Sequence, residues 1–210
     1  MRAHLLTLVV ATTGSASLAA TKDGFTRTTG SFQDNGFSAG MELVPAGFNS
    51  TLNKPWIVEN VDDLMVTIVG GLPSTASADT GRSLSVGLPR DIQWHGTQTP
   101  VTTNPATRPR LIEQWVPGAV EDTGAMVDTG LYALTWNALA NKGLMTTLRQ
   151  MSALRNHFPP GLTFEVDDDL LRVTGSPAPS FTQPITTDNG YESSTLRIPW
   201  RVMTTNLEVA

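Results

Sequence analysis

Short apolar segments separated by turn residues characterise the first third of the chain. Turn-forming sequences such as Asp34-Asn35-Gly36 lie between these segments. Their alternation of apolar and polar positions, or their β-branched composition, is typical of strands. The expected strands are Leu5–Val10, Met41–Val44, Trp56–Glu59 and Leu64–Val69. We therefore predict a small all-β module over residues 1–72.

A small and polar stretch, PSTASADTGR, follows this module. Such a composition favours a linker, which we place at residues 73–83. The remainder, residues 84–210, combines further strand patterns with one helical pattern. The strand-like segments are Leu111–Val116, Leu131–Asn137, Leu162–Val166, Leu170–Val173 and Thr195–Met203.

One helix is predicted within LMTTLRQMSALRNHF. Its apolar residues recur every three or four positions and form a single stripe: Leu144, Leu148, Met151, Leu154 and Phe158. Pro159-Pro160-Gly161 should end it, because proline neither donates a backbone hydrogen bond nor favours a helical residue before it. The expected class is therefore a β-rich α+β fold, in which an antiparallel or mixed sheet packs against one main helix.

The first twenty residues allow two interpretations. Arg2, an apolar run and the small residues Ala16–Ala20 are features of a secretory signal peptide. Against this, the apolar run from Leu5 to Ala11 is short and contains Thr7, and the same residues fit a strand. We prefer the strand and expect the segment to be retained, so that the protein is not secreted.

Composition narrows the function classes. The 210 residues contain no cysteine, which excludes disulfides, thiol nucleophiles and Cys-ligated metals. The formal net charge of −5 gives no general basic footprint for gripping DNA. No apolar run approaches the ~20 residues that a membrane-spanning helix needs.

No motif for catalysis, cofactor binding or metal binding is found. The three histidines, His4, His95 and His157, are far apart in sequence and lack metal-ligand spacing. The acidic pairs and triplets, such as Asp62-Asp63, are better interpreted as solvated turns. The five tryptophans favour core or interface anchors over a stacking platform for sugars or bases. We expect no enzyme and no cofactor.

The order of elements between Leu84 and Val202 resembles the tail terminator (tail completion) proteins of long-tailed bacteriophages. The segments that carry the resemblance are Pro117-Gly118, Gly130-Leu131-Tyr132, His157-Phe158-Pro159-Pro160-Gly161 and Ile198-Pro199-Trp200-Arg201. The simplest members of that family begin with a helix directly before the first strand. Here the β module of residues 1–72 takes that place.

The resemblance implies a non-enzymatic virion protein that forms a ring, usually a hexamer, at the head-proximal end of the tail tube. Such a ring stops tube polymerisation and joins the neck proteins of the head, while genomic DNA passes through the lumen without sequence-specific binding. Its partners would be other copies of the chain, the tail tube protein and the head-completion proteins. It would assemble in the bacterial cytoplasm, without a membrane.

Residues 97–110 are predicted to form a loop that contains prolines. Such a loop is suited to contacting a neighbouring subunit, because proline lowers the conformational entropy lost on docking. A surface loop without a partner is an equal alternative. Arg108 and Arg110 at its end are candidate contacts to an acidic partner surface. Trp115, Arg197 and Arg201 complete the candidate interface.

Three other functions remain open from the sequence. The first is another neck-ring or tail tube subunit of the same phage. The second is a secreted β-rich carbohydrate-binding protein, from which residues 1–20 have been removed. The third is a hydrolase with a Ser-His-Asp site, for which no motif is present.

Overall fold

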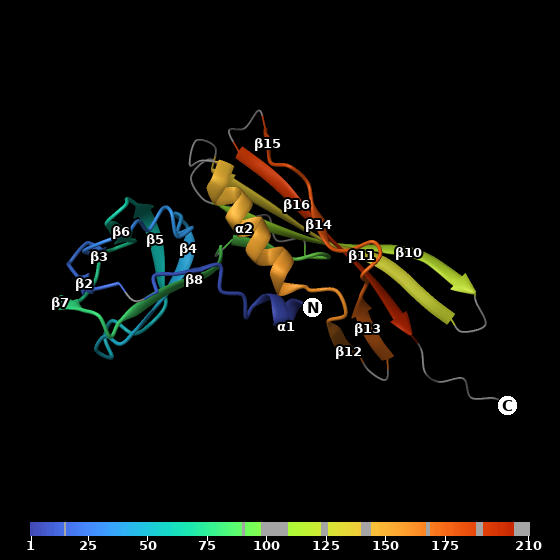
Figure 1. The fold of residues 1–210 in the computed structure, drawn as a ribbon, viewed down its shortest axis with the longest axis horizontal. Helices are drawn as coiled ribbons and strands as arrows, with labels where there is room; N and C mark the ends of the chain where they lie inside the picture. The colour runs from blue at the N-terminus through green and yellow to red at the C-terminus, as the bar shows by residue number, and fades with distance from the viewer. Residues whose placement is uncertain are drawn as a thin grey trace.

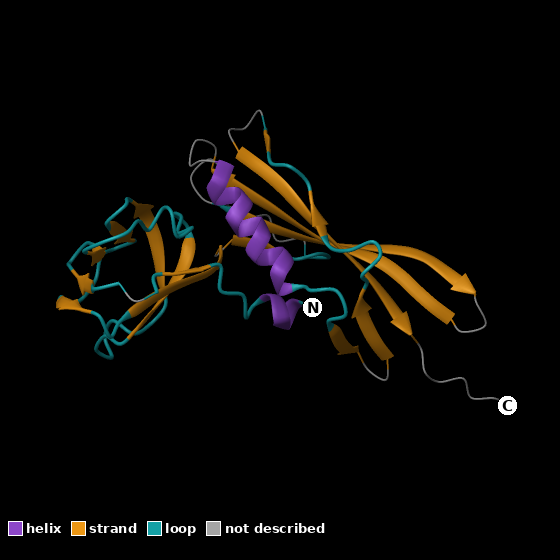
Figure 2. Ribbon diagram, viewed as in Figure 1, coloured by secondary structure: helices purple, strands orange, loops and turns teal. Residues whose placement is uncertain are grey.

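The computed structural model describes residues 1–14, 16–89, 91–97, 109–122, 126–139, 144–166, 169–187 and 191–203. Within these ranges the chain forms two eight-stranded sheets and two helices, of which only one is long (Figure 1; Figure 2). The predicted β-rich α+β class with one main helix is confirmed.

The first sheet uses strands from the first 89 residues and has the order β1-β8-β4-β5-β6-β3-β2-β7, with every neighbouring pair antiparallel. Its strands are β1 (Ala11–Thr12), β2 (Leu18–Ala20), β3 (Gly24–Arg27), β4 (Met41–Ala46), β5 (Trp56–Val61), β6 (Met65–Ile68), β7 (Ala76–Asp79) and β8 (Ser83–Pro89). Phe25, Met41 and Leu43 are among its fully buried side chains. Three of the four strands expected here, those now labelled β4, β5 and β6, are confirmed.

The predicted strand Leu5–Val10 is wrong. Residues 2–5 instead form α1 (Arg2–Leu5), a single helical turn, in which the N–H groups of Leu5 and Leu6 donate to carbonyls four residues earlier. Leu5 and Leu8 are buried, whereas Leu6 and Val9 are exposed. Burial therefore follows the spacing of a helical turn rather than the period of two that a strand requires.

The residues predicted as a linker, 73–83, also form sheet. Strand β7 pairs with β2, and its small side chains, which are exposed except for half-buried Ala76, suit the edge position that it occupies. Strand β8 follows at once and pairs with β1 and β4, burying Leu84, Val86 and Leu88. The first sheet therefore extends to Pro89 instead of ending at residue 72. The division of the chain into two domains stays a prediction.

The second sheet has the order β12-β13-β16-β11-β10-β9, with β14 and β15 also pairing with β16. Its strands are β9 (Asp91–Gln93), β10 (Arg110–Asp122), β11 (Met126–Leu139), β12 (Thr163–Val166), β13 (Asp169–Val173), β14 (Ser180–Phe181), β15 (Ile185–Thr186) and β16 (Tyr191–Met203). The β9–β10 pair is parallel and the other pairs are antiparallel, so the sheet is mixed. The predicted strands of this half are confirmed, and β10, β11 and β16 are longer than expected.

Helix α2 (Leu144–His157) covers one face of this second sheet (Figure 1). The predicted stripe is confirmed where it is described: Met151, Leu154 and Phe158 are fully buried and Leu148 is half-buried. Fully burying an apolar side chain of this size contributes about 1.5–3 kcal/mol. The helix ends before Pro159, as the sequence predicts.

Polar contacts join α2 to the first sheet's part of the chain. Gln150 is 1% exposed and its Nε2 donates to Ser38 Oγ at 3.1 Å. Arg149 Nη1 lies 4.0 Å from a carboxylate oxygen of Asp34. Helix α2 thus contacts both parts of the chain, the second sheet through apolar residues and the first part through polar residues.

Candidate functional site

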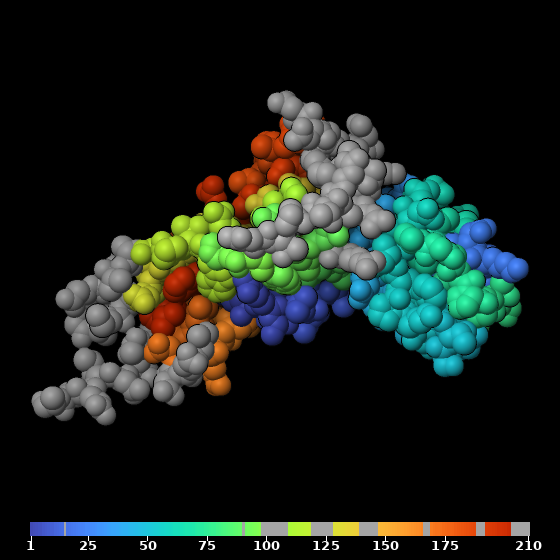
Figure 3. All heavy atoms as spheres, turned by 180° about the vertical axis from the view of Figure 1, so that it is seen from behind, coloured from blue at the N-terminus to red at the C-terminus, as the bar shows by residue number. Residues whose placement is uncertain are grey.

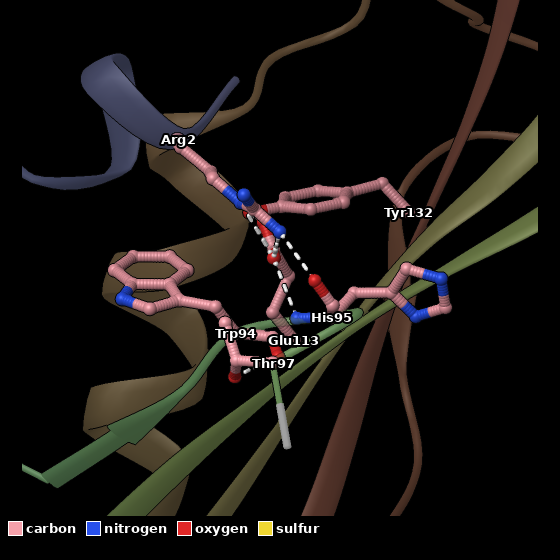
Figure 4. A network of polar contacts seen from close by, with 6 residues as sticks. All are labelled: Arg2, Trp94, His95, Thr97, Glu113 and Tyr132. Carbon is pink, nitrogen blue, oxygen red and sulfur yellow. Dashed lines mark hydrogen bonds and ion pairs between the residues drawn. The ribbon is translucent and has the colours of Figure 1, made fainter. Parts of the chain in front are cut away.

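A buried carboxylate lies at the centre of a polar network that joins distant parts of the chain. Glu113 projects from β10 and is 2% exposed. Its two oxygens accept hydrogen bonds from Arg2 Nε at 2.8 and 2.7 Å, and from Tyr132 Oη at 2.9 Å (Figure 4). The backbone N–H of His95 donates to the same carboxylate at 3.0 Å, while Arg2 Nη2 donates to the His95 carbonyl at 3.0 Å. We call these four residues the N-terminal clamp.

The clamp is electrostatically satisfied. Burial alone would raise the pKa of Glu113, but the hydrogen bonds that it accepts outweigh burial and hold that pKa below its ordinary value. Burial also raises the pKa of Tyr132, and the adjacent Glu113 charge raises it further. Glu113 is therefore ionised and Tyr132 neutral at neutral pH. A carboxylate held by donors on both oxygens, beside a phenol that keeps its proton, is a structural link and not an acid–base pair for catalysis.

A pair of histidines fastens α1 to the end of α2. The rings of His4 and His157 stack with centroids 4.0 Å apart. Each Nε2 lies 2.7 Å from the backbone carbonyl of the other residue, so both nitrogens act as donors. Burial lowers the pKa of His157, and the His4 ring lowers it as well, whereas the bond to the carbonyl opposes this. Both Nε2 atoms thus bind backbone carbonyls, and the pair links α1 to α2.

The face of the second sheet opposite α2 carries arginines. The strand register places Arg110, Arg172, Arg197 and Arg201 on this side, because residues paired across strands share a face and alternate residues of one strand do too. Arg110 is half-buried and the other three are exposed. We call this surface the arginine face. Figure 3 views the molecule from behind, where residues of β10 (yellow-green) come to the surface.

The predicted interface residues divide between the two faces. Arg110, Arg197 and Arg201 all lie on the arginine face, so the structure brings three of them onto one surface. Trp115 lies on the opposite, core-facing side, where the centroid of its ring is 4.6 Å from that of the Tyr132 ring. Arg108 lies outside the described residues, as does most of the predicted loop 97–110.

A groove of about 820 Å³ opens where β10, β11, β13 and β16 approach the loops after α2 and β13. Trp200 lies across Gly130, where a Cβ atom would come within 2.3 Å of the indole. The buried Nε1 of Trp200 has no partner among the described residues. Arg172 and Arg201 also line the groove, so it combines aromatic surface with two cations.

Sequence reasoning missed several of these residues. Glu113 alternates with Leu111 and Trp115, and a carboxylate on an apolar strand face is a pattern that calls for a buried partner. The partner, Arg2, is 111 residues away and could not be identified from local pattern. Arg172 was missed because its position beside Arg201 depends on the pairing of β13 with β16.

Two kinds of feature are absent from the described part of the chain. No group of three or more histidine and carboxylate side chains there is placed to hold a metal ion. Neither helix is long and apolar enough to cross a membrane.

Comparisons with known proteins are sparse. No family model matches the chain, and no curated protein matches it. One solved structure, whose name states no activity, aligns with 53% of this chain and 78% of its own, at 20% identity. Its TM-score of 0.42 is too low to carry an argument about fold or function.

Proposed function

We propose that this protein is a non-enzymatic virion subunit that forms a ring at the head-proximal end of a phage tail tube. The ring, a hexamer in this proposal, ends tube polymerisation and provides the surface to which the neck proteins of the head bind. Genomic DNA passes through its lumen without sequence-specific binding. Assembly takes place in the bacterial cytoplasm and requires no cofactor.

The observation that best supports this proposal is the arginine face. Arg172, Arg197 and Arg201 are exposed, and none forms an ion pair with a carboxylate of the described residues. Unpaired cations on a broad sheet face suit a protein partner better than a small-molecule pocket. The buried carboxylate of the N-terminal clamp, by contrast, is bound by donors of the same chain. Function therefore lies in surfaces.

The long hairpin of β10 and β11 adds a second surface. The two strands pair over most of their length, whereas β9 pairs with β10 only at residues 110–112, and the hairpin extends away from the rest of the sheet (Figure 1). Val116, near the projecting end, is 40% exposed. Such a hairpin can extend the contact area of a subunit with its neighbour. We further propose that the first sheet acts as an added module, which the simplest terminators lack.

Light scattering of the purified protein tests the proposal, first alone and then with tail tube protein. A ring-sized mass, together with shortened tubes capped by this protein, is the expected result. A chain that stays monomeric and leaves tube length unchanged would refute it. A tail tube subunit would instead stack into open-ended polymers, because its contacts repeat without closing.

The carbohydrate-binding alternative makes a different prediction. It requires accessible tryptophan faces, whereas Trp136 is fully buried and Trp115 contacts Tyr132 and Trp200. Binding of soluble oligosaccharides that quenches tryptophan fluorescence would favour this alternative over a ring.

A further inference from the structure

Two arginines are paired directly across adjacent strands. Arg172 of β13 and Arg201 of β16 are register partners, and both are exposed. Like charges in this position repel each other. No carboxylate of the described residues forms an ion pair with either one. The position is unfavourable in the isolated chain and becomes favourable when an anionic group binds both guanidinium groups.

The surroundings of this pair suit a protein segment rather than a free ion. The groove described above adjoins both arginines, and Pro199, two residues before Arg201 and on the same face, adds apolar surface. Leu170, two residues from Arg172 and on the same face, is 43% exposed. Cations bordered by exposed apolar side chains match the mixed character of protein interfaces, in which charge orients a partner and apolar contact holds it.

The same chain carries a complementary acidic surface. Glu59, Asp62 and Asp63 surround the turn between β5 and β6 and are exposed. None of the three forms an ion pair among the described residues. We call these three residues the acidic turn.

The acidic turn is held in place by the loop of residues 31–37. Ser31 Oγ donates to Asp63 Oδ1 at 2.6 Å, and Gln33 Nε2 donates to the Val61 carbonyl at 2.8 Å. The backbone N–H of Phe32 donates to the Asp63 carbonyl at 2.8 Å. A turn fixed in this way loses little conformational entropy when it binds, which favours it as the docking element.

The two surfaces lie in different sheets, toward opposite ends of the long axis (Figure 1). They are therefore placed to meet between molecules. We propose that the arginine pair of one subunit binds the acidic turn of the next copy of this chain, head to tail. A contact between two different patches of identical chains closes into a ring when the rotation between subunits allows it. The inference rests on the proposed ring and specifies which surfaces form it.

A charge exchange tests this contact in the full-length protein. Arg172→Glu with Arg201→Glu should raise the concentration needed for ring formation by about tenfold or more, because like charges would then face each other. Glu59→Lys with Asp62→Lys should do the same, and it leaves the bond between Ser31 and Asp63 intact. Combining all four substitutions should restore assembly to within a few-fold of the wild type. Light scattering over a dilution series measures each case.

A matched control separates the contact from net charge. Lys22→Glu with Lys54→Glu changes the net charge as much as the arginine variant does, on exposed residues of the first sheet's part of the chain, and should leave assembly unchanged. Circular dichroism confirms that each variant is folded. Full assembly of the arginine variant, or a four-substitution variant that stays dissociated, would overturn the proposed contact while leaving the ring itself intact.

Two further outcomes point elsewhere. A wild-type chain that forms no ring, alone or with tube protein, overturns both the proposed function and this contact. Wild-type binding to duplex DNA that the arginine variant loses, with assembly unaffected, would assign the arginine face to nucleic acid and overturn the contact.

Discussion

Arg2 and Glu113 are 111 residues apart in sequence, yet the Nε of Arg2 lies within 2.8 Å of both oxygens of the Glu113 carboxylate. This contact fastens the first helical turn onto the second sheet. The carboxylate is fully buried, while the arginine side chain is 46% exposed. The pair is therefore asymmetric. Glu113 has lost its contact with water and needs Arg2 as a hydrogen-bond donor, whereas Arg2 remains partly hydrated.

Replacing Arg2 should destabilise the fold. Arg2→Met keeps the aliphatic stem but removes the donors to a buried carboxylate. We expect a loss of about 1–3 kcal/mol in the free energy of unfolding, below the ~3–5 kcal/mol of a fully buried pair because water reaches the arginine. Urea denaturation measures it. Arg197→Ala, at an exposed site, should change stability by less than about 0.5 kcal/mol. Equal effects of the two variants would contradict the clamp.

Tyr132→Phe removes one donor to the same carboxylate and leaves the ring packed. Hydrogen bonds to charged groups contribute about 1.5–3 kcal/mol, so a loss in this range is expected. Because Tyr132 and Arg2 share the carboxylate of Glu113, their effects should be non-additive by about 0.5 kcal/mol or more in a double-mutant cycle. Strict additivity would mean that the two donors act independently.

Glu113 should give the fold a dependence on acid pH. Its pKa is lower in the folded protein than the ordinary value of 4.5, so the unfolded chain binds the proton more tightly. The stabilisation is complete above pH 4.5 and is lost as pH falls through the lower folded pKa. Glu113→Gln should remove this part of the slope. Unfolding free energies measured from pH 6 down to pH 3, roughly spanning that range, provide the comparison.

His157 should act in a separate pH window. Its pKa is below the ordinary 6.5 in the folded protein, so protonation favours the unfolded chain. Stability should be complete above pH 6.5 and decline as pH falls from there toward the folded pKa. His157→Gln keeps a donor for the His4 carbonyl and should abolish this decline. His95→Gln is the matched control, since its backbone and not its ring serves the clamp. A slope that persists in His157→Gln would assign it to another group.

The close approach of Trp200 to Gly130 gives a steric prediction. A Cβ at Gly130 would lie 2.3 Å from the indole, so Gly130→Ala should cost about 1–3 kcal/mol of stability. The cost should shrink in a Trp200→Leu background. Gly81→Ala, whose new Cβ would lie 3.6 Å from its nearest neighbour, should be nearly neutral. Thermal denaturation of the wild type, the three single variants and the double variant distinguishes a clash from a general effect of alanine.

The periodicity of apolar residues correctly predicted those elements in which buried side chains recur at regular intervals along one segment. The stripe that ends at Phe158 defined α2, and the alternation of Leu196 with Arg197 defined the two faces of β16. It failed for residues 5–10, since Leu5 and Leu8 fit a helical turn as well as Leu6 and Leu8 fit a strand. Segments this short do not contain enough periods to decide between the two.

Which residues share a candidate surface depends on the register between paired strands, and the periodicity of apolar residues does not determine that register. The sequence shows that Arg201 faces away from Trp200, but only the pairing of β13 with β16 places Arg172 beside it. The clamp likewise joins residues that share no local pattern. The predicted linker failed for a related reason, because an edge strand of small and polar residues such as β7 has the composition of a loop.

The clamp also fixes an order of events during synthesis. The first helical turn leaves the ribosome long before Glu113, and His157 follows 153 residues after His4. Domains begin to fold from the N-terminal side during translation. While the whole first sheet is being made, the N-terminal turn therefore has neither Glu113 nor His157 to bind. Closure of the N-terminal turn onto both anchors therefore has to wait for β10 and for the end of α2.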